Sequence, residues 1–322
     1  MTRGGIWGKE RQVQETLMRW AAERGYHVGW GLPSAIDAAR DDVLSRRRSG
    51  ELDPAFFEAN LASFESFEAP WEGPATAVVV VMPRPAHLVT FTVEDRQVET
   101  VFPPTYVRFS PLFEEVRQDL QEHGLPGARV ERLKVPLKSL AARLGLVRYG
   151  RTNVTYAPGF GSYLQLFGYL TDAALPLPED WRPCEPELLP ECDGCSVCLA
   201  ACPTGAIGED RVLLRGERCL VAVNERVGGW PAWIPPSAHN CIIGCLLCQR
   251  PCPANPELPV ERTGIVFTAE ETEALLSDGG AHEGPVWGGV RAKVERIGLP
   301  SEEQQVLGRN LRALLDARQR RR

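Results

Sequence analysis

The sequence predicts a protein of mixed helices and strands joined to a separate cysteine-rich domain. Three observations support this prediction. Patterns of amphipathic helix and buried strand occupy the first half of the chain, the prolines of residues 176–190 form a connector, and all 10 cysteines lie between Cys184 and Cys252. We therefore expect one domain over residues 1–180, a second over residues 181–260 and a C-terminal helical segment over residues 261–322.

The first half of the chain contains four clear local patterns. Residues 9–23 have the spacing of an amphipathic helix, and a short strand is expected at residues 26–30. Asp53 and Pro54 are typical of a helix N-cap and first turn. The valine run of residues 77–82 ends at a proline and predicts a strand that is buried on both faces.

Three more segments have helical spacing, and a glycine-rich segment lies between two of them. The helices are expected over residues 111–122, 136–144 and 306–315. The glycine-rich segment covers residues 145–168 and also contains three tyrosines. Such a density of glycine allows the backbone to approach another surface closely, and that surface is either a neighbouring strand or a ligand.

Charge and hydropathy limit the classes of function. The formal net charge of the 322-residue chain is -6, and no basic stripe stands out apart from the end of the chain, residues 318–322. Because affinity for nucleic acid depends on neutralising phosphates, this balance gives little support to a tight DNA or RNA binder. There is no signal-like start and no long uncharged apolar stretch, so a cytoplasmic protein is expected.

The cysteines are arranged in two short runs. Residues 192–203 contain the spacing C-x2-C-x2-C-x3-C-P, and residues 245–253 contain C-x2-C-x3-C-P. The first spacing is that of bacterial ferredoxins with two [4Fe-4S] clusters, in which the fourth cysteine of a run binds the other cluster. Zinc sites use paired C-x2-C units instead, so zinc is the less favoured alternative. His239 lies near the second run, but the thiolates suffice without it.

The crossed arrangement assigns four ligands to each cluster. The second run lacks one local ligand, which either Cys219 or Cys241 could supply. Cys184 is then expected to be a small buried thiol. The first cluster is expected to bind Cys192, Cys195, Cys198 and Cys252, and the second Cys202, Cys245, Cys248 and one of the two isolated cysteines.

A longer pattern surrounds these runs and resembles a known family. Residues 143–153 read Arg-Leu-Gly-Leu-Val-Arg-Tyr-Gly-Arg-Thr-Asn, and residues 159–163 read Gly-Phe-Gly-Ser-Tyr. With the double cysteine run, Arg218-Cys219 and Gly244-Cys245, this resembles the epoxyqueuosine reductases and the related reductive dehalogenases. The resemblance extends over roughly residues 75–255. It implies an α+β, nitroreductase-like sandwich that binds cobalamin, followed by a bacterial ferredoxin-like double-cluster domain.

The resemblance also assigns roles to residues. It favours Cys219 over Cys241 as the last ligand and makes residues 1–180 the catalytic domain. An aspartate of the family donates a proton, and counting back from Gly145 places Glu131 near that position, although an exposed surface charge is the alternative. The other candidate catalytic residues are Tyr149 and Tyr156, and the expected cofactor-binding residues are Gly150, Arg151, Asn153, Gly161 and Ser162.

Two departures from the family bear on the substrate. The usual Gly-Trp and Gly-Lys of the glycine segment are replaced by Val147-Arg148 and Gly150-Arg151. The C-terminal helical-repeat extension that serves transfer RNA is absent or much shortened, which weakens transfer RNA as the substrate.

The function expected from these patterns is an iron–sulfur reductase. A flavodoxin or ferredoxin would supply electrons, which would pass through the two clusters to cobalamin and reduce an electrophilic substrate. Two alternatives remain open: a ferredoxin-like electron carrier without cobalamin, and a reductive dehalogenase, which the absence of an export signal disfavours.

Overall fold

The computed structural model describes residues 3–73, 75–209, 215–277, 283–299 and 304–320. Its contacts divide the chain into two compact units. The first unit contains residues 1–83 and 112–194, and the second contains residues 84–111 and 195–322. The sequence placed residues 84–111 within the first predicted domain, whereas they pack in the second unit. The domain boundaries expected near residues 180 and 260 stay predictions.

The first unit is built on an antiparallel sheet with the order β1-β2-β8-β5. The central strands are β2 (Thr76–Pro83) and β8 (Leu164–Thr171), and the outer strands are β1 (His27–Gly31) and β5 (Val130–Arg132). Every residue of β2 except its final proline is buried, as the valine run predicts.

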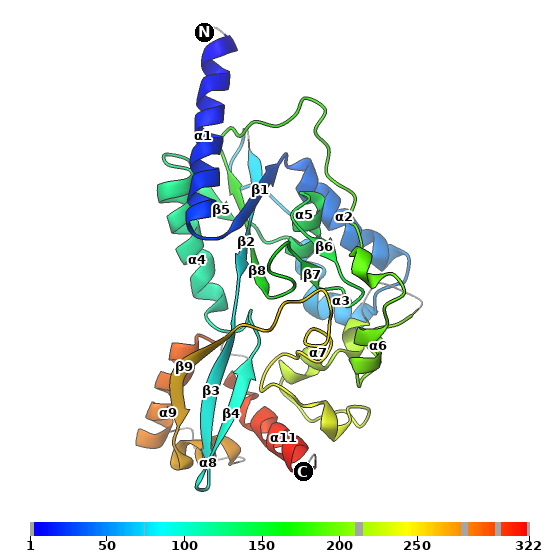
Figure 1. The fold of residues 1–322 in the computed structure, drawn as a ribbon, viewed down its shortest axis with the longest axis vertical. Coiled ribbons are helices and arrows are strands. Elements are labelled where there is room, and N and C mark those ends of the chain that lie inside the picture. The colour runs from blue at the N-terminus through cyan, green and yellow to red at the C-terminus, as the bar shows by residue number, and fades with distance from the viewer. Residues whose placement is uncertain (1–2, 74, 210–214, 278–282, 300–303, 321–322) are drawn as a thin grey trace. The chain divides into compact units, whose positions relative to one another are not determined.

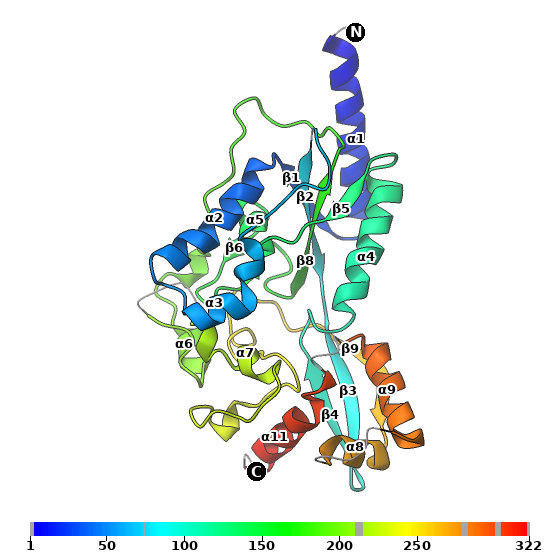
Figure 2. The same ribbon diagram turned by 180° about the vertical axis from the view of Figure 1, so that it is seen from behind.

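Helices cover both faces of this sheet, as Figures 1 and 2 show. On one face, α2 (Ser34–Arg48) and α5 (Leu137–Arg143) pack against the odd-numbered residues of β2. On the other face, α4 (Phe109–Asp119) places Phe113 against Phe167 of β8, with ring centroids 4.8 Å apart. Burial on two faces explains why the strand is continuously apolar, and the arrangement confirms the predicted α+β class.

The remaining elements of the first unit are short, apart from one long helix. Helix α1 spans Arg3–Glu23, α3 spans Pro54–Asn60, and the two-residue strands β6 (Arg148–Tyr149) and β7 (Thr155–Tyr156) form a hairpin. Asp53 caps α3 by accepting a hydrogen bond from the backbone N–H of Phe56 at 2.7 Å, as the sequence predicts.

The second unit contains a three-stranded sheet with the order β4-β3-β9. Strands β3 (Ala86–Val93) and β4 (Arg96–Phe102) form an antiparallel hairpin, and β9 (Val260–Phe267) pairs in parallel with β3. The expectation that residues 261–322 are helical is wrong for β9. Its pairing with β3 is remote in sequence, so no local pattern reveals it.

Helices pack around this second sheet. They are α8 (Ala269–Leu276), α9 (Pro285–Ile297) and α11 (Leu307–Arg320), and their core includes Ile242 and Ile243 from the loop before the second cysteine run. The cysteine region itself contains α6 (Val197–Ala201) and α7 (Leu220–Asn224). The second run is therefore anchored to a packed core immediately before its first cysteine. Among the described residues, no helix has both the length and the apolar composition needed to cross a bilayer.

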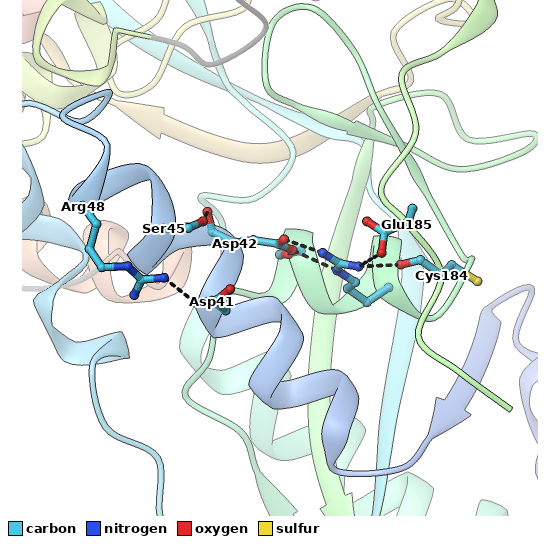
Figure 3. Close-up of polar contacts among 8 residues, drawn as sticks. Asp41, Asp42, Ser45, Arg48, Cys184 and Glu185 are labelled. Carbon is cyan, nitrogen blue, oxygen red and sulfur yellow. Dashed lines mark hydrogen bonds and ion pairs between the residues drawn. The ribbon is translucent and has the colours of Figure 1, made fainter.

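The guanidinium of Arg143 joins two helices to the connector. It donates to both carboxylate oxygens of Asp42 on α2, at 2.6 and 3.1 Å, and to the Glu185 carboxylate at 2.8 Å. It also donates to the carbonyl of Cys184 at 3.2 Å, and Figure 3 shows these acceptors around the same group. The side chains of Arg143 and Asp42 are only 13% and 24% exposed. The hydrogen bonds and charge of Asp42 raise the pKa of Arg143.

We expect Arg143→Met to destabilise the protein, because it leaves the Asp42 carboxylate without its main partner in a partly buried position. A loss of about 2 kcal/mol in the free energy of unfolding is expected, measured by urea denaturation. The matched control is Arg148→Met, since Arg148 pairs with Glu187 where both side chains are more than half exposed. That variant should change stability by less than about 1 kcal/mol. Equal losses in the two variants would contradict the assignment.

Candidate cofactor and cluster sites

The glycine-rich segment forms a tight hairpin at β6 and β7. The backbone N–H of Gly150 donates to the Val154 carbonyl at 2.8 Å, and that of Asn153 donates to the Gly150 carbonyl at 2.9 Å. Asn153 has a φ of +59°, and Lys138 donates to its carbonyl and side-chain oxygens at 2.9 and 3.0 Å. A Cβ atom on Gly150 would lie 2.6 Å from the ring of Tyr156, so this position requires glycine. The hairpin therefore brings Gly150, Arg151 and Asn153 together.

A second turn follows the hairpin. The backbones of Ala157 and Gly161 exchange hydrogen bonds of 3.0 and 3.1 Å, and Gly161 has a φ of +59°. Ser162 is buried immediately after this turn. The five residues expected to bind a cofactor thus lie on two consecutive turns of the first unit.

Arg151 connects the hairpin to the first cysteine of the first run. Its backbone N–H donates to the Cys192 sulfur at 3.4 Å, and its Nη2 donates to the Cys192 carbonyl at 3.3 Å. Within the described part of the chain, its Nε is buried and has no hydrogen-bond partner. Since an unpartnered buried donor is costly, an acceptor on a bound group would complete this position. The turn therefore fits a cofactor that offers a hydrogen-bond acceptor.

The connector brings Cys192 to this position. The N–H of Tyr149 donates to the Glu187 carbonyl and the N–H of Leu189 donates to the Tyr149 carbonyl, both at 2.8 Å. The connector thus runs alongside β6, even though its prolines suggest few hydrogen bonds.

The three candidate catalytic residues lie in different environments. Glu131 is exposed on β5. Tyr149 is half-buried, and burial, with a further contribution from Asp42, raises its pKa to about 12, while a hydrogen bond with Ser139 acts in the opposite direction. Tyr156 is buried against Gly150. Tyr156 packs against Gly150, and Tyr149 immediately precedes Gly150 in the same hairpin.

Cys248 lies within reach of the charges of four other thiols of the second unit. Burial raises the pKa of Cys248, and the charges of Cys245, Cys219 and Cys202 raise it further, with Cys198 contributing after them. Burial also raises the pKa of Cys219 to about 11, and the nearby Cys245 and Cys202 act in the same direction. Such thiols become thiolates only beside a compensating positive charge, which iron supplies. Three of these four thiols, Cys202, Cys219 and Cys245, form with Cys248 the group of four predicted to bind the second cluster.

Polar groups surround the sulfurs of this group. Although burial acts to raise the pKa of Cys202, it is lowered overall by hydrogen bonds from the Thr204 hydroxyl, 3.5 Å from the sulfur, and from the N–H groups of Thr204, Ala206 and Ile207. The side-chain amide of Asn240 donates to the Cys245 sulfur at 3.2 Å. Donors of this kind stabilise sulfur that carries negative charge, so the surroundings suit bound thiolates.

The remaining cysteines differ from this group. Cys241 is only 3% exposed, and its thiol donates to the Asn240 side-chain oxygen at 3.2 Å. Burial, followed by the charge of Cys245, raises its pKa to about 12. Cys184 is exposed. His239, next to this loop, is buried with its ring 4.4 Å from that of Trp230.

No three His, Cys, Asp or Glu side chains in the described ranges are grouped so that they could hold one metal ion. Thiolates that hold a cubane each bind a different iron atom, so they stand further apart than the ligands of a single ion.

The cysteine region matches a known family. Residues 191–255 match the family described as the 4Fe-4S double cluster binding domain. This match includes both cysteine runs, Cys219 and Cys241. The region is a double [4Fe-4S] cluster domain, and the cofactor expected from the cysteine spacing is confirmed.

Relatives of the longer pattern are epoxyqueuosine reductases. The chain is 31% identical to the enzyme of Bacillus cereus over 118 residues. This aligned segment covers 37% of this chain and 29% of the relative. It is 32% identical to the enzyme of Pseudomonas aeruginosa over 151 residues, and this aligned segment covers 46% of this chain and 39% of the relative. The matched segments span roughly a third of the length of such relatives.

Solved structures extend the likeness to almost the whole chain. A selenomethionine-labelled epoxyqueuosine reductase superposes with a TM-score of 0.60 over 95% of this chain and 81% of that chain, at 18% identity. The chain has the fold of the epoxyqueuosine reductases. The enzyme of Streptococcus thermophilus gives the same TM-score at 16% identity, covering 94% of this chain and 81% of the other. Sequence likeness and fold together confirm the predicted resemblance.

Asn240 is a functional candidate that the sequence analysis missed. Asn240 lies between His239 and Cys241, five residues before the second cysteine run begins at Cys245, and this position was a usable signal because amide donors are suited to thiolate sulfur. Asparagine in such a loop is more often assigned to a turn, which hides this role.

The two isolated cysteines allow a direct test of the ligand assignment. We expect Cys219→Ala to lose one cluster, so that iron falls from about eight to about four atoms per chain, because its sulfur belongs to the group of four. The matched control Cys241→Ala should keep about eight, since its thiol already bonds to Asn240. Iron and acid-labile sulfide are measured on anaerobically reconstituted protein, and the reverse outcome would refute Cys219.

Proposed function

We propose that this protein is a cobalamin-dependent reductase of the epoxyqueuosine reductase type. Cobalamin would bind at the two turns of the first unit, and electrons would reach it through the two [4Fe-4S] clusters. The observation that supports this best is the pair of hydrogen bonds from Arg151 to Cys192, which joins the expected cofactor-binding turn to a predicted cluster ligand.

The chain would contribute placement and exclusion of water. Bound cobalamin supplies the reducing centre, whose chemistry is its own. The glycines of the turns would allow close approach of the backbone, and the Arg151 Nε would donate to an acceptor of the cofactor. Buried Thr152, Thr155 and Tyr156 would keep the neighbourhood of the turn dry. A dry site strengthens each electrostatic contact within it.

Glu131 is proposed as the proton donor, and Tyr149 and Tyr156 as secondary candidates. The exposed position of Glu131 on β5 leaves its carboxyl open to an incoming substrate. The pKa of Tyr149 is raised to about 12, so its hydroxyl keeps its proton at neutral pH and acts as a hydrogen-bond donor.

The substrate class follows from the reaction. We propose a substrate with an electrophilic carbon that bears a leaving oxygen, as in an epoxide. Removal of that oxygen as water takes two electrons and two protons. One relative of this fold was crystallised with an epoxyqueuosine-modified tRNA stem loop, at a TM-score of 0.56, so modified tRNA is the first substrate to test. The net charge of -6 lends little support to tight RNA binding.

The partner and location are proposed from the chemistry. A low-potential one-electron carrier, such as a flavodoxin or a ferredoxin, would supply the electrons. We place the protein in the cytoplasm, where thiols that serve as cluster ligands are not lost to disulfides.

Titration with cob(II)alamin tests the proposal. The reconstituted protein is expected to change the absorption spectrum of the corrinoid on binding. Arg151→Met should weaken this binding about tenfold, as the loss of one hydrogen bond implies. Arg148→Met, which removes an exposed guanidinium from the same hairpin, is the control and should bind as the wild type does. No spectral change with excess corrinoid and full clusters would refute the proposal and favour an electron carrier.

A turnover assay tests the proton donor. We expect Glu131→Gln to slow loss of the epoxide oxygen from epoxyqueuosine-modified tRNA about a hundredfold, because an amide cannot donate the required proton. The nucleosides are measured by mass spectrometry with chemically reduced holoenzyme. Glu122→Gln, another exposed carboxyl in the first unit, should leave the rate unchanged. An unchanged rate in Glu131→Gln would exclude this residue.

A further inference from the structure

The Asn240 side chain lies at the centre of the loop that leads to the second cysteine run. Its Nδ2 donates to the Ala238 carbonyl at 3.0 Å and to the Cys245 sulfur at 3.2 Å. Its Oδ1 accepts from the Leu246 N–H at 3.0 Å and from the Cys241 thiol at 3.2 Å. Both amide hydrogens and both lone pairs therefore have a partner, and the side chain is fully engaged.

These partners also fix which way the amide faces. A flipped amide would place its oxygen against the Ala238 carbonyl and its nitrogen against the Leu246 N–H, and both contacts would be repulsive. Only the observed orientation satisfies all four neighbours. The N–H group of Asn240 is consequently held toward the sulfur of Cys245.

Two further asparagines hold the backbone between Asn240 and Cys245. Asn224, at the end of α7, donates to the Gly244 carbonyl at 2.7 Å and accepts from the Gly244 N–H at 3.2 Å. Asn310 of α11 donates to the carbonyls of Asn224 and Ile242, each at 2.7 Å. Asn224 and Asn310 are both buried, at 1% exposure. A backbone fixed by such bonds gives the amide a constant distance to the sulfur.

Close packing at Gly244 also helps to fix the backbone of the loop between Asn240 and Cys245. Gly244 has a φ of +72°, and a Cβ atom there would lie 2.6 Å from the Tyr106 ring and 2.8 Å from Pro103. The loop therefore has no room to shift toward these side chains, and its conformation requires glycine.

We propose that Asn240 is a positioning residue that raises the reduction potential of the cluster bound by Cys245. Reduction adds one electron to the cluster and makes its sulfur ligands more negative. A hydrogen bond from an amide stabilises the more negative state more strongly, and hydrogen bonds to sulfur are among the factors that set these potentials. The proposal depends on the clusters and is independent of cobalamin and of the substrate.

Two substitutions at this position separate the N–H donor from the rest of the side chain. Asn240→Leu removes the donor and the acceptor. Asn240→Asp keeps an oxygen to accept from Leu246 but places a negative charge beside the sulfur. The expected order of potentials is wild type highest, Asn240→Leu lower and Asn240→Asp lowest. For Asn240→Asp the reduction equilibrium should shift about tenfold, equivalent to about 59 mV for a one-electron couple.

The potentials are measured by anaerobic redox titration of the full-length, reconstituted protein, followed by electron paramagnetic resonance. The other cluster in the same sample is the internal reference and should keep its potential. Asn60→Leu is the matched control, since the Asn60 amide donates to the Phe56 carbonyl. Iron and sulfide content establish that both clusters are present.

Three outcomes would overturn the proposal. The first is an unchanged potential in Asn240→Leu with full clusters, and the second is an equal shift of both clusters. The third is loss of the second cluster from both variants, which would make the amide a folding element rather than a determinant of potential. Failure to bind cobalamin would leave this result unaffected, so the two proposals fail separately.

Discussion

The burial of several thiols within reach of one another's charge is the constraint on which the second unit depends. Removing a thiolate from water is costly, and each neighbouring thiolate increases the cost. Burial and neighbouring thiols raise the pKa values of Cys219 and Cys248, in keeping with this cost. Folding of this region is thereby linked to binding of iron, because the metal supplies the charge that the chain lacks. Hydrogen bonds from amide and hydroxyl donors then stabilise the negative charge that remains on sulfur.

Local patterns were sufficient for part of the fold. The valine run of β2 revealed burial on two faces, and Asp53 with Pro54 revealed the start of α3, because each element is specified by adjacent residues. The hairpin of β3 and β4 and its parallel partner β9 were missed. Their pairing joins residues 86–91 to residues 260–267, and no local pattern records a contact across that separation.

The candidate sites, like the fold, could be predicted only in part from local patterns. Cysteine spacing alone indicated the two clusters, because ligands to one cluster must reach it from a short loop. The choice of Cys219 rather than Cys241 came from the family resemblance, because the spacing alone left both open. The partnership of Arg151 with Cys192 could not be predicted, because it depends on a connector that runs beside β6. The hydroxyl environment of Tyr149, close to Ser139 and Asp42, was equally invisible, since these residues come from three separate segments.

The parallel pairing of β3 with β9 also bears on how the protein is made. During translation, residues 86–93 emerge long before residues 260–267, and the chain between them contains every cysteine. The hairpin must therefore wait with one edge uncovered, which favours protection by a chaperone. Asn310 lies still later in the chain, so the loop before Cys245 acquires its final support near the end of synthesis. Delivery of iron and sulfide to a completed chain would suit this order better than delivery to a nascent one.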